Sequence, residues 1–386
     1  MKKGTKNTAN GPDDASRITR MVFYLCMIFI ACQAAGLDFL EQRRPERIIN
    51  SRGLTDERRL SDYLPSLKGT RGDTYVMFYA GKQPGGTLLV LGGTHPNEPG
   101  GYIAAVVMAE NLIVDRGRVI IIPRADASAF TATEPQEAYP GRITLTNRRG
   151  RPRDFRVGSR YANILDGWPD PIVYRHHPSG QLLSGAETRN LNRAYPGRHN
   201  GTLIERVAWA ITEVVRKEQV DMVIDLHEAA PEYPVINAIV AHPHAKDIAA
   251  MATVELQMRG IDLRLEISPE NFHGLSHREI GDFTPAKAVL LETTGALQGR
   301  LRGPTDADLA VSSRDALYHR AGELGKLHVD FPAEGVSLKQ RVGRHLESIK
   351  VLCETLGMFE PEKTIEFHQV PGYEELMKHG VGFYLN

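Results

Sequence analysis

The chain has 386 residues, of which 41% are hydrophobic and 24% are charged. This composition is typical of a globular protein with a large core and excludes a wholly disordered or fibrous chain. Lysine and arginine number 47, as do aspartate and glutamate, so the chain lacks the basic excess of a nucleic-acid-binding protein. Three cysteines are too few for a disulfide framework, and the length suits about two or three domains or one large α/β unit.

The N-terminal segment contains an apolar run over residues 21–37, preceded by a basic flank. The run is as long as the core of a secretory signal and marginal for a membrane span, which needs roughly 20 residues. We therefore expect residues 1–37 to be a signal or membrane-anchor segment that can contact a membrane. The protein would then be exported to the periplasm or cell envelope. The alternative is a buried helix of the main domain.

Residues 38–70 are rich in charged and turn-forming residues and predict a linker. Beyond it, short apolar runs alternate with helical patterns. Strands are predicted over 75–80, 87–92, 119–122, 222–226, 236–240, 263–267 and 288–291. Helices are predicted over 101–111, 203–215, 245–259, 312–327 and 337–356, the last ending at Gly357.

This alternation predicts an α/β fold with a mostly parallel or mixed sheet and helices on both faces. We expect residues 71–335 to form the main domain, and residues 336–386 to add a C-terminal helix and tail that pack on it. Residues 131–200 differ from the rest because they show little periodicity. Seven arginines lie between positions 142 and 160, which predicts either a solvated surface or functional loops.

Two histidines and a glutamate follow predicted strands. His95 and Glu98 come after one buried strand, and His227 comes directly after another. In open α/β sheets, ligands bind beyond the carboxyl ends of the strands, so these side chains should meet at one edge. Two imidazoles and a carboxylate form a catalytic zinc arrangement that leaves a position for water, and they suit Zn²⁺ better than Mg²⁺. We predict one Zn²⁺ per chain, held by His95, Glu98 and His227.

A carboxylate is needed to move protons during hydrolysis. Glu292 directly follows a third buried strand, where partial desolvation should raise its pKa, so it is the predicted general base and acid. It could instead be a helix cap or a salt-bridge partner. Glu228 is the second candidate base, although its side chain would point away from that of His227 if the strand continued. His242 and His244 are rival metal ligands.

Asn192 and Arg193 place an amide beside a guanidinium just before a Tyr-Pro-Gly turn. Arginine pairs with carboxylates through two parallel hydrogen bonds, so these residues are the predicted substrate-carboxylate binders. The alternative is a structural arginine that binds nearby carbonyl groups.

Four motifs together resemble the succinylglutamate desuccinylase and aspartoacylase branch of the zinc carboxypeptidase superfamily, over roughly residues 75–330. They are Gly-Gly-Thr-His95-Pro-Asn-Glu98-Pro, Leu-Asn192-Arg193-Ala-Tyr-Pro-Gly, Asp225-Leu-His227 and Leu-Leu-Glu292-Thr. The resemblance implies the carboxypeptidase α/β fold, His95, Glu98 and His227 as zinc ligands, Asn192 and Arg193 as carboxylate binders, and Glu292 as the group that activates water.

The chain departs from the family at two points. Pro96 stands where the deacylases usually have glycine. The family also has an arginine that polarises the scissile carbonyl and a tyrosine on the substrate side. The sequence does not single out either residue, and Arg175, 17 residues before Asn192, is the arginine we name.

These residues favour a zinc-dependent hydrolase that cleaves an amide bond adjacent to a carboxylate. Its substrate would be a peptide or a small molecule with a free carboxylate, as for a carboxypeptidase or an N-acyl-amino-acid deacylase. The alternative is a non-catalytic metal-containing binding protein of the cell envelope, which would not need Glu292. A serine or cysteine hydrolase is disfavoured because no G-x-S-x-G motif exists and Cys353 lies on a predicted helix.

Overall fold

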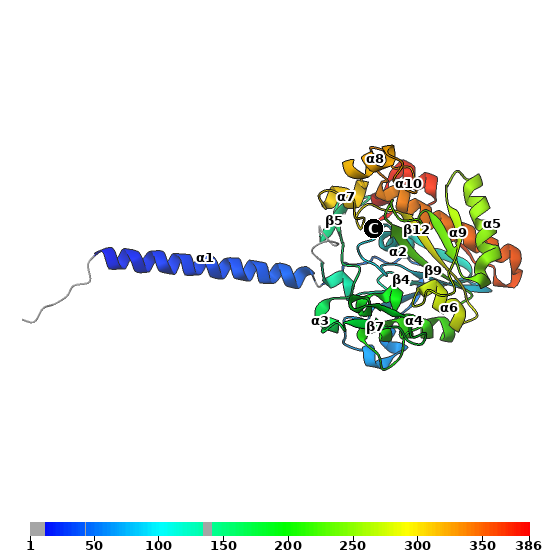
Figure 1. Cartoon of the computed structure of the whole chain (residues 1–386), viewed down its shortest axis with the longest axis horizontal. Helices are drawn as coiled ribbons and strands as arrows, with labels where there is room; N and C mark the ends of the chain where they lie inside the picture. Colours follow the sequence, from blue (N-terminus) through cyan, green and yellow to red (C-terminus); the bar gives the residue numbers. More distant parts are fainter. Residues whose placement is uncertain (1–11, 43, 134–140) are drawn as a thin grey trace, which may run out of the picture. The chain divides into compact units, whose positions relative to one another are not determined.

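The computed structural model describes residues 12–42, 44–133 and 141–386, which fall into two compact units divided between Pro45 and Glu46 (Figure 1). The first unit contains one long helix, α1 (Pro12–Gln42). Its segment Asp14–Glu41 is the one helix in the described ranges that is long and apolar enough to cross a membrane. The apolar side chains of α1 are exposed.

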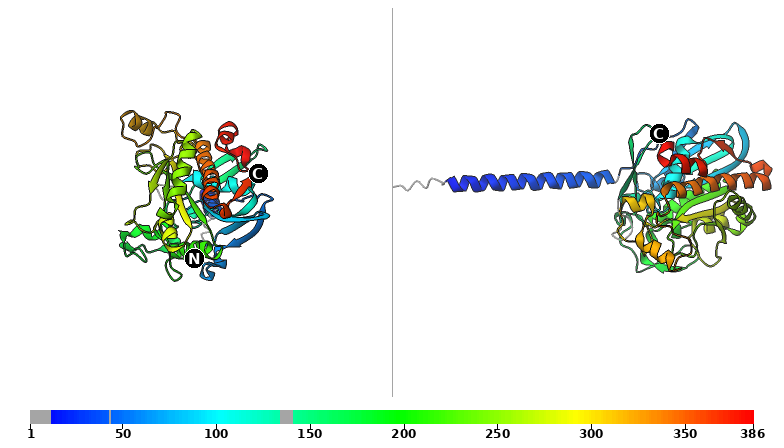
Figure 2. Two further views of the ribbon diagram at one scale, coloured as in Figure 1. Left: turned by 90° about the vertical axis from the view of Figure 1, so that its right-hand side faces the viewer. Right: turned by 90° about the horizontal axis from the view of Figure 1, so that it is seen from above.

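The second unit is built on a nine-stranded mixed sheet, counted over the described residues (Figures 1 and 2). The order is β1-β2-β4-β3-β9-β12-β10-β11, with β13 also paired to β4. The centre, β4-β3-β9-β12, is parallel, whereas β1, β2, β10 and β13 run antiparallel to their inner neighbours. The strands are β1 (Leu54–Arg59), β2 (Tyr75–Ala80), β3 (Gln83–Leu91), β4 (Ile113–Ile122), β9 (Met222–Ala229), β10 (Ala238–Ala241), β11 (Arg264–Ile267), β12 (Lys287–Thr294) and β13 (Glu366–His368).

Helices cover both faces of this sheet, which confirms the predicted α/β class. The alternation of side chains along β3 shows the two layers: Leu88 and Val90 pack with α2, α5 and α9, whereas Leu89 and Leu91 pack with α4. The helices are α2 (Pro99–Asn111), α3 (Ile164–Gly167), α4 (Leu203–Lys217), α5 (Lys246–Met258), α6 (Ser276–Phe283), α7 (Ala307–Ser312), α8 (Ala316–Glu323), α9 (Leu338–Phe359) and α10 (Tyr373–His379). Helix α4 begins with a capping box formed by Thr202 and Glu205.

Three of the differences between the predicted and the observed elements have a clear cause. Residues 46–70 of the segment predicted as a linker belong to the folded unit, because β1 pairs with β2 at the edge of the sheet. The helix predicted over 312–327 is two helices, since Ser313 adopts a left-handed conformation and Asp315 caps α8. Helix α9 continues through Gly357 to Phe359, and a side chain at Gly357 would meet the Thr364 hydroxyl at 3.0 Å.

The arginine-rich region contains two small hairpins rather than only loops. Strand β5 (Arg142–Thr146) pairs with β6 (Pro152–Arg156), and β7 (Val173–Arg175) pairs with β8 (Leu182–Ser184). Residues 134–140 of this region lie outside the described part of the chain. A short 3-10 turn, Leu191–Arg193, follows the second hairpin and carries the predicted carboxylate binders.

Candidate metal centre and active site

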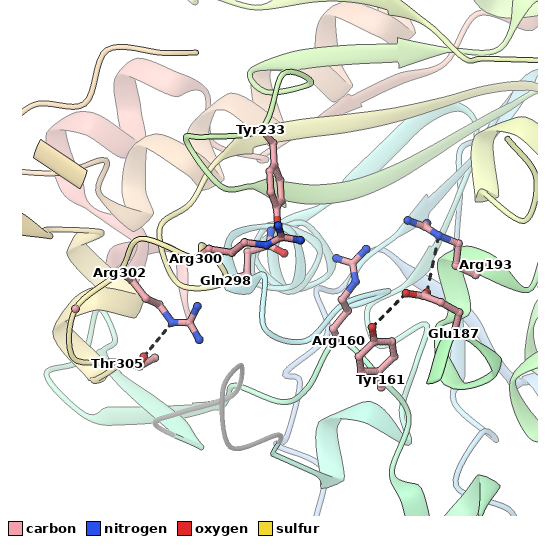
Figure 3. A pocket seen from close by; sticks show the side chains of 10 residues that line it. Arg160, Tyr161, Glu187, Arg193, Tyr233, Gln298, Arg300, Arg302 and Thr305 are labelled. Carbon is pink, nitrogen blue, oxygen red and sulfur yellow. Dashed lines mark hydrogen bonds and ion pairs between the residues drawn. The ribbon is translucent and has the colours of Figure 1, made fainter. Parts of the chain in front are cut away.

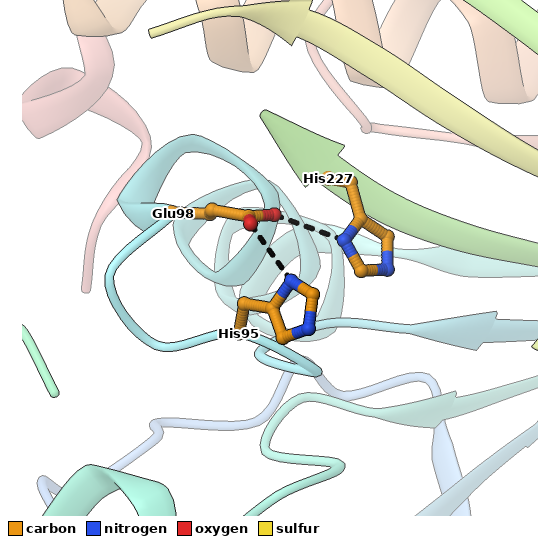
Figure 4. A group of neighbouring side chains, drawn as sticks. All are labelled: His95, Glu98 and His227. Carbon is orange, nitrogen blue, oxygen red and sulfur yellow. Dashed lines mark hydrogen bonds and ion pairs between the residues drawn. The ribbon is translucent and has the colours of Figure 1, made fainter. Parts of the chain in front are cut away.

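The three predicted metal ligands lie together at the end of the parallel centre of the sheet (Figure 4). One ligand atom from each of His95, Glu98 and His227 lies within 4.8 Å of the others, and all three residues are buried. Nδ1 of His95 is 2.7 Å from Glu98 Oε1, and Nδ1 of His227 is 2.9 Å from Glu98 Oε2. A turn closed by the Glu98 amide and the His95 carbonyl aims both side chains at one point.

The other nitrogen of each imidazole lies close to a side-chain oxygen. His95 Nε2 is 2.9 Å from Asn190 Oδ1, and His227 Nε2 is 3.0 Å from Asp225 Oδ2. Asp225 accepts hydrogen bonds from the Thr94 hydroxyl at 2.8 Å and the Ser276 hydroxyl at 2.5 Å. Both Nδ1 atoms are thereby turned toward the centre, as expected of histidines oriented for a metal ion.

The charges at this centre also suit a zinc ion. Burial lowers the pKa of His95 to about 4, so its imidazole is neutral and able to bind a metal near pH 7. Burial would raise the pKa of Glu98, but the two imidazoles outweigh it and keep the carboxylate ionised. Burial opposes protonation of His227, yet Asp225 and Glu98 raise its pKa overall, so metal binding would displace a proton there. Two imidazole nitrogens and one carboxylate therefore fit Zn²⁺.

Glu292 lies next to this centre, because β12 pairs with β9 and Glu292 is the direct neighbour of His227 across the two strands. Both residues lie within their strands, which run longer than predicted, rather than after them. Burial is the main cause that raises the pKa of Glu292, to about 8. Its Oε2 has no hydrogen-bond partner in the described part of the chain, and the side chain lines the same cavity of about 300 Å³ as the triad.

The other candidate base, Glu228, and the other candidate metal ligand, His242, form contacts with other side chains. The Glu228 carboxylate pairs with the Arg341 guanidinium at 2.8 Å, and both side chains are buried. It also accepts a hydrogen bond from the Gly100 amide at 3.1 Å, so Glu228 borders the cavity as a structural residue. His242 Nε2 is 3.0 Å from Asp282 Oδ1 in a separate cluster with Arg278. Among the described residues, the one grouping suited to a metal is His95, Glu98 and His227.

Asn192 and Arg193 line the cavity beside the triad. The Asn192 side-chain oxygen accepts a hydrogen bond from the Ser276 amide at 2.8 Å, which fixes the turn. The Arg193 guanidinium lies 4.8 Å from the ring centre of Phe272, and its Nε is 3.9 Å from Glu187 Oε2. Burial is the main cause that lowers the pKa of Arg193 to about 10, so it still carries its charge at pH 7.

Several cavity residues were not found from the sequence, among them Arg160, Tyr233 and His277. Arg160 lines the cavity with an Nη1 atom 3.7 Å from Glu98 Oε1, and Tyr233 lines it from the loop after β9. His277 is buried against the cavity, and neither of its ring nitrogens has a hydrogen-bond partner among the described residues. Arg175, named from its spacing, is exposed on β7 and is not a cavity residue. The one sequence signal for Arg160 is its place in the arginine-rich run.

A comparison with protein-family models identifies the family of this chain. The model described as Succinylglutamate desuccinylase/Aspartoacylase catalytic domain matches residues 84–305, which include the triad, the Asn192–Arg193 pair and Glu292. The chain belongs to this family. The resemblance predicted from the four motifs is therefore confirmed. Succinylglutamate desuccinylase/aspartoacylase proteins are zinc-dependent hydrolases, and the buried triad is consistent with such a zinc site.

Three solved structures illustrate the range of sequence identity and coverage among the structures similar to this chain. An aspartoacylase family protein from Mesorhizobium loti is 22% identical, with a TM-score of 0.36, and the match covers 58% of this chain and 57% of that one. A succinylglutamate desuccinylase/aspartoacylase from Rhodobacter sphaeroides is 17% identical, with a TM-score of 0.37 and coverage of 57% and 51%. The product-bound cell shape determinant Csd4 from Helicobacter pylori is 13% identical, with a TM-score of 0.44 and coverage of 79% and 59%.

The chain thus spans little more than half the length of the solved structures it matches. No curated protein sequence matches it significantly.

Proposed function

We propose that this protein is a zinc-dependent hydrolase that cleaves an amide bond adjacent to a carboxylate. The observation that carries the proposal is one cavity that holds the His95, Glu98 and His227 triad, Glu292 and Arg193 together. A bound zinc ion would lower the pKa of a water molecule and polarise the scissile carbonyl.

The chain's own residues would supply the remaining steps. Glu292 would take the proton of the attacking water and later give it to the leaving nitrogen. The burial that raises its pKa favours the second transfer, and a nearby cation, which would lower that pKa, would favour the first. Arg193 and Asn192 would bind the substrate carboxylate and so set the position of the scissile bond. Arg160, beside Glu98, is placed to donate hydrogen bonds to the scissile carbonyl oxygen as negative charge develops on it.

Both a carboxypeptidase and an N-acyl-amino-acid deacylase fit this chemistry, because they differ only in what flanks the amide bond. The exposed helix α1 supports a signal or anchor role for residues 1–37. We infer that the folded unit, with residues 71–335 as its catalytic part, works in the periplasm or cell envelope, where peptides are the more available substrates.

A non-catalytic metal-binding protein is the second candidate. The position of Glu292 argues against it, because this carboxyl group lines the same cavity as the triad and its Oε2 has no hydrogen-bond partner in the described part of the chain, whereas a protein that only holds a metal needs no such group. A cysteine hydrolase is disfavoured by burial of Cys353 on α9, which raises the pKa of that thiol to about 12.

The test is hydrolysis by the zinc-loaded full chain of N-acyl amino acids and short peptides, each with a free or an amidated carboxyl end. We expect turnover of the free acids, with Glu292→Gln lowering kcat by about 10²–10⁴-fold at unchanged zinc content. Full activity of Glu292→Gln would remove Glu292 from the mechanism. Zinc binding without turnover of any compound would favour the binding protein.

A further inference from the structure

Exposed apolar side chains gather on one segment outside the metal cavity, which contains α3 and the β7–β8 hairpin. Ile172 is 97% exposed and Trp168 is 68% exposed. The other exposed apolar side chains of this segment are Ile164, Leu165, Val173 and Leu182. We call residues 164–182 the apolar segment. Large apolar groups left together in water are typical of surfaces that bind a membrane or another protein.

The polar side chains of the apolar segment hold it to the folded unit. The Ser128 hydroxyl donates a hydrogen bond to Asp166 at 2.6 Å, and the Asp170 carboxylate pairs with the Arg189 guanidinium at 2.8 Å. Tyr174 of β7 is buried, because successive side chains of a strand point to opposite faces. The two carboxylates and the tyrosine are therefore bound to the fold, and the apolar side chains are left on the outside.

The tip of the β5–β6 hairpin adds positive charge. It carries three exposed arginines, Arg148, Arg149 and Arg151, none of which forms an ion pair within the described residues. The Asn147 side-chain oxygen accepts hydrogen bonds from the Arg149 amide at 3.0 Å and the Arg151 amide at 2.9 Å, which orders the turn. We call residues 148–151 the basic tip. Its charge suits anionic lipid headgroups.

Both features are tied to the residues where the folded unit begins. Arg153, two residues after the basic tip, donates from Nη2 to the Arg47 carbonyl at 2.9 Å. Arg124 donates to the Glu46 carbonyl at 2.9 Å, and Ser128, which holds α3, follows four residues later. In the view of Figure 1, β5 and α3 lie on the same side of the folded unit. The apolar segment and the basic tip are therefore both close to the start of the folded unit.

The connection to α1 is short. Residues 43–45 separate the end of α1 from Glu46. This length limits the distance between the Cα atoms of Gln42 and Glu46 to roughly 14 Å, whatever the angle between the two units. If α1 anchors the chain through its segment Asp14–Glu41, the start of the folded unit must stay near the bilayer surface. The apolar segment and the basic tip are then within reach of that surface.

We propose that the apolar segment and the basic tip form a docking surface that holds the folded unit on a bilayer containing anionic lipids. Tryptophan and aliphatic side chains enter the interfacial region of a bilayer, and arginines bind its anionic headgroups. A second copy of this chain is a poorer occupant, because a two-fold interface would bring two arginine-bearing surfaces together. The inference rests on the proposed anchor role of α1 and does not depend on hydrolysis.

The two tryptophans of the chain, Trp168 and Trp209, provide a test with an internal control. Trp209 is partly buried on α4, outside the docking surface. The full chain is reconstituted into vesicles of phosphatidylglycerol and phosphatidylcholine, with or without bromine on the acyl chains as a quencher. We expect Trp209→Phe, which reports on Trp168, to lose most of its emission in brominated vesicles, and Trp168→Phe to keep its emission. The unmodified chain should show an intermediate loss, which does not depend on how either variant folds.

Substitutions in the Trp209→Phe chain test the two parts of the surface. Replacing the three arginines of the basic tip by glutamine should weaken docking by about 10²-fold, as expected for three basic residues near an anionic surface. Vesicles without phosphatidylglycerol should have a similar effect. Ile172→Ser should also reduce quenching, whereas Met258→Ser, an apolar residue on α5 that is 77% exposed, is the matched control and should not.

Alkaline carbonate extraction of the same vesicles separates anchoring from docking. A chain that stays in the membrane while Trp168 is unquenched, or is quenched no more than Trp209, overturns the docking surface and leaves the anchor intact. Protection of Trp168 from both brominated lipid and aqueous acrylamide would mean that protein covers it, which also overturns the proposal. Release of the chain by carbonate overturns the anchor and the docking surface together, and none of these outcomes depends on whether the chain is a hydrolase.

Discussion

The metal centre has a neighbour, a larger pocket lined by Arg160, Arg193, Arg300 and Arg302 that we call the outer pocket (Figure 3). The two are built from different parts of the fold. The centre lies at the end of the sheet: His227 and Glu292 are neighbours on β9 and β12, and His95 and Glu98 lie on the short turn that joins β3 to α2. The outer pocket is carried by loops, with arginines that come from three separate connections.

This structural difference suits two different tasks, metal binding at the centre and substrate selection in the pocket. Residues on neighbouring strands are held by the sheet and by buried hydrogen bonds, which suits groups that must keep a fixed geometry around a metal. Loop residues can change without altering the sheet, which suits the selection of substrates. We therefore expect substitutions at the metal centre to affect metal binding and kcat, and substitutions in the outer pocket to affect KM.

The larger effect is expected from a substitution of Asp225, which lies next to the metal ligand His227. Asp225→Asn keeps the size of the side chain but removes the charge that orients His227 and favours its interaction with a cation. Loss of such a partner typically costs about 10–100-fold in metal affinity, which a zinc titration with a competing chelator would measure. Thr212→Val, a buried change of similar size on α4, is the control. Unchanged zinc affinity in Asp225→Asn would mean that His227 is oriented by the strand alone.

A smaller effect, on KM, is expected from a substitution of Arg193, the proposed substrate-carboxylate binder. Arg193→Ala removes a contact made in both the ground state and the transition state, so KM should rise by about 10-fold while kcat changes little. The preference for a free carboxylate over its amide should weaken at the same time. Steady-state kinetics on a paired acid and amide would measure both. A loss confined to kcat would contradict a binding role and place Arg193 in the chemical step.

The sequence predicted the sheet-borne part of the site well. Unbroken apolar runs are typical of strands buried on both faces, and the polar residues at their ends could be expected to meet at one edge. Asp225 could also have been found, because side chains two apart on a strand point to the same face, and it precedes His227 by two positions.

The loop-borne part was not predictable in the same way. Arg160 and Arg300 reach their pockets through irregular connections, where neither periodicity nor spacing fixes the direction of a side chain. The β7–β8 hairpin lies between Arg160 and Asn192, so a guess from spacing selected Arg175. The edge strand β1 was missed because its exposed, charged residues resemble those of a linker.

The zinc content of the purified full chain and of two variants, measured by elemental analysis, tests the three metal ligands. We expect about one zinc per chain in the unmodified protein and in Glu292→Gln, and loss of most of the zinc in His227→Ala. Full zinc in His227→Ala, or loss of zinc in Glu292→Gln, would contradict the assignment of His95, Glu98 and His227 as the metal ligands.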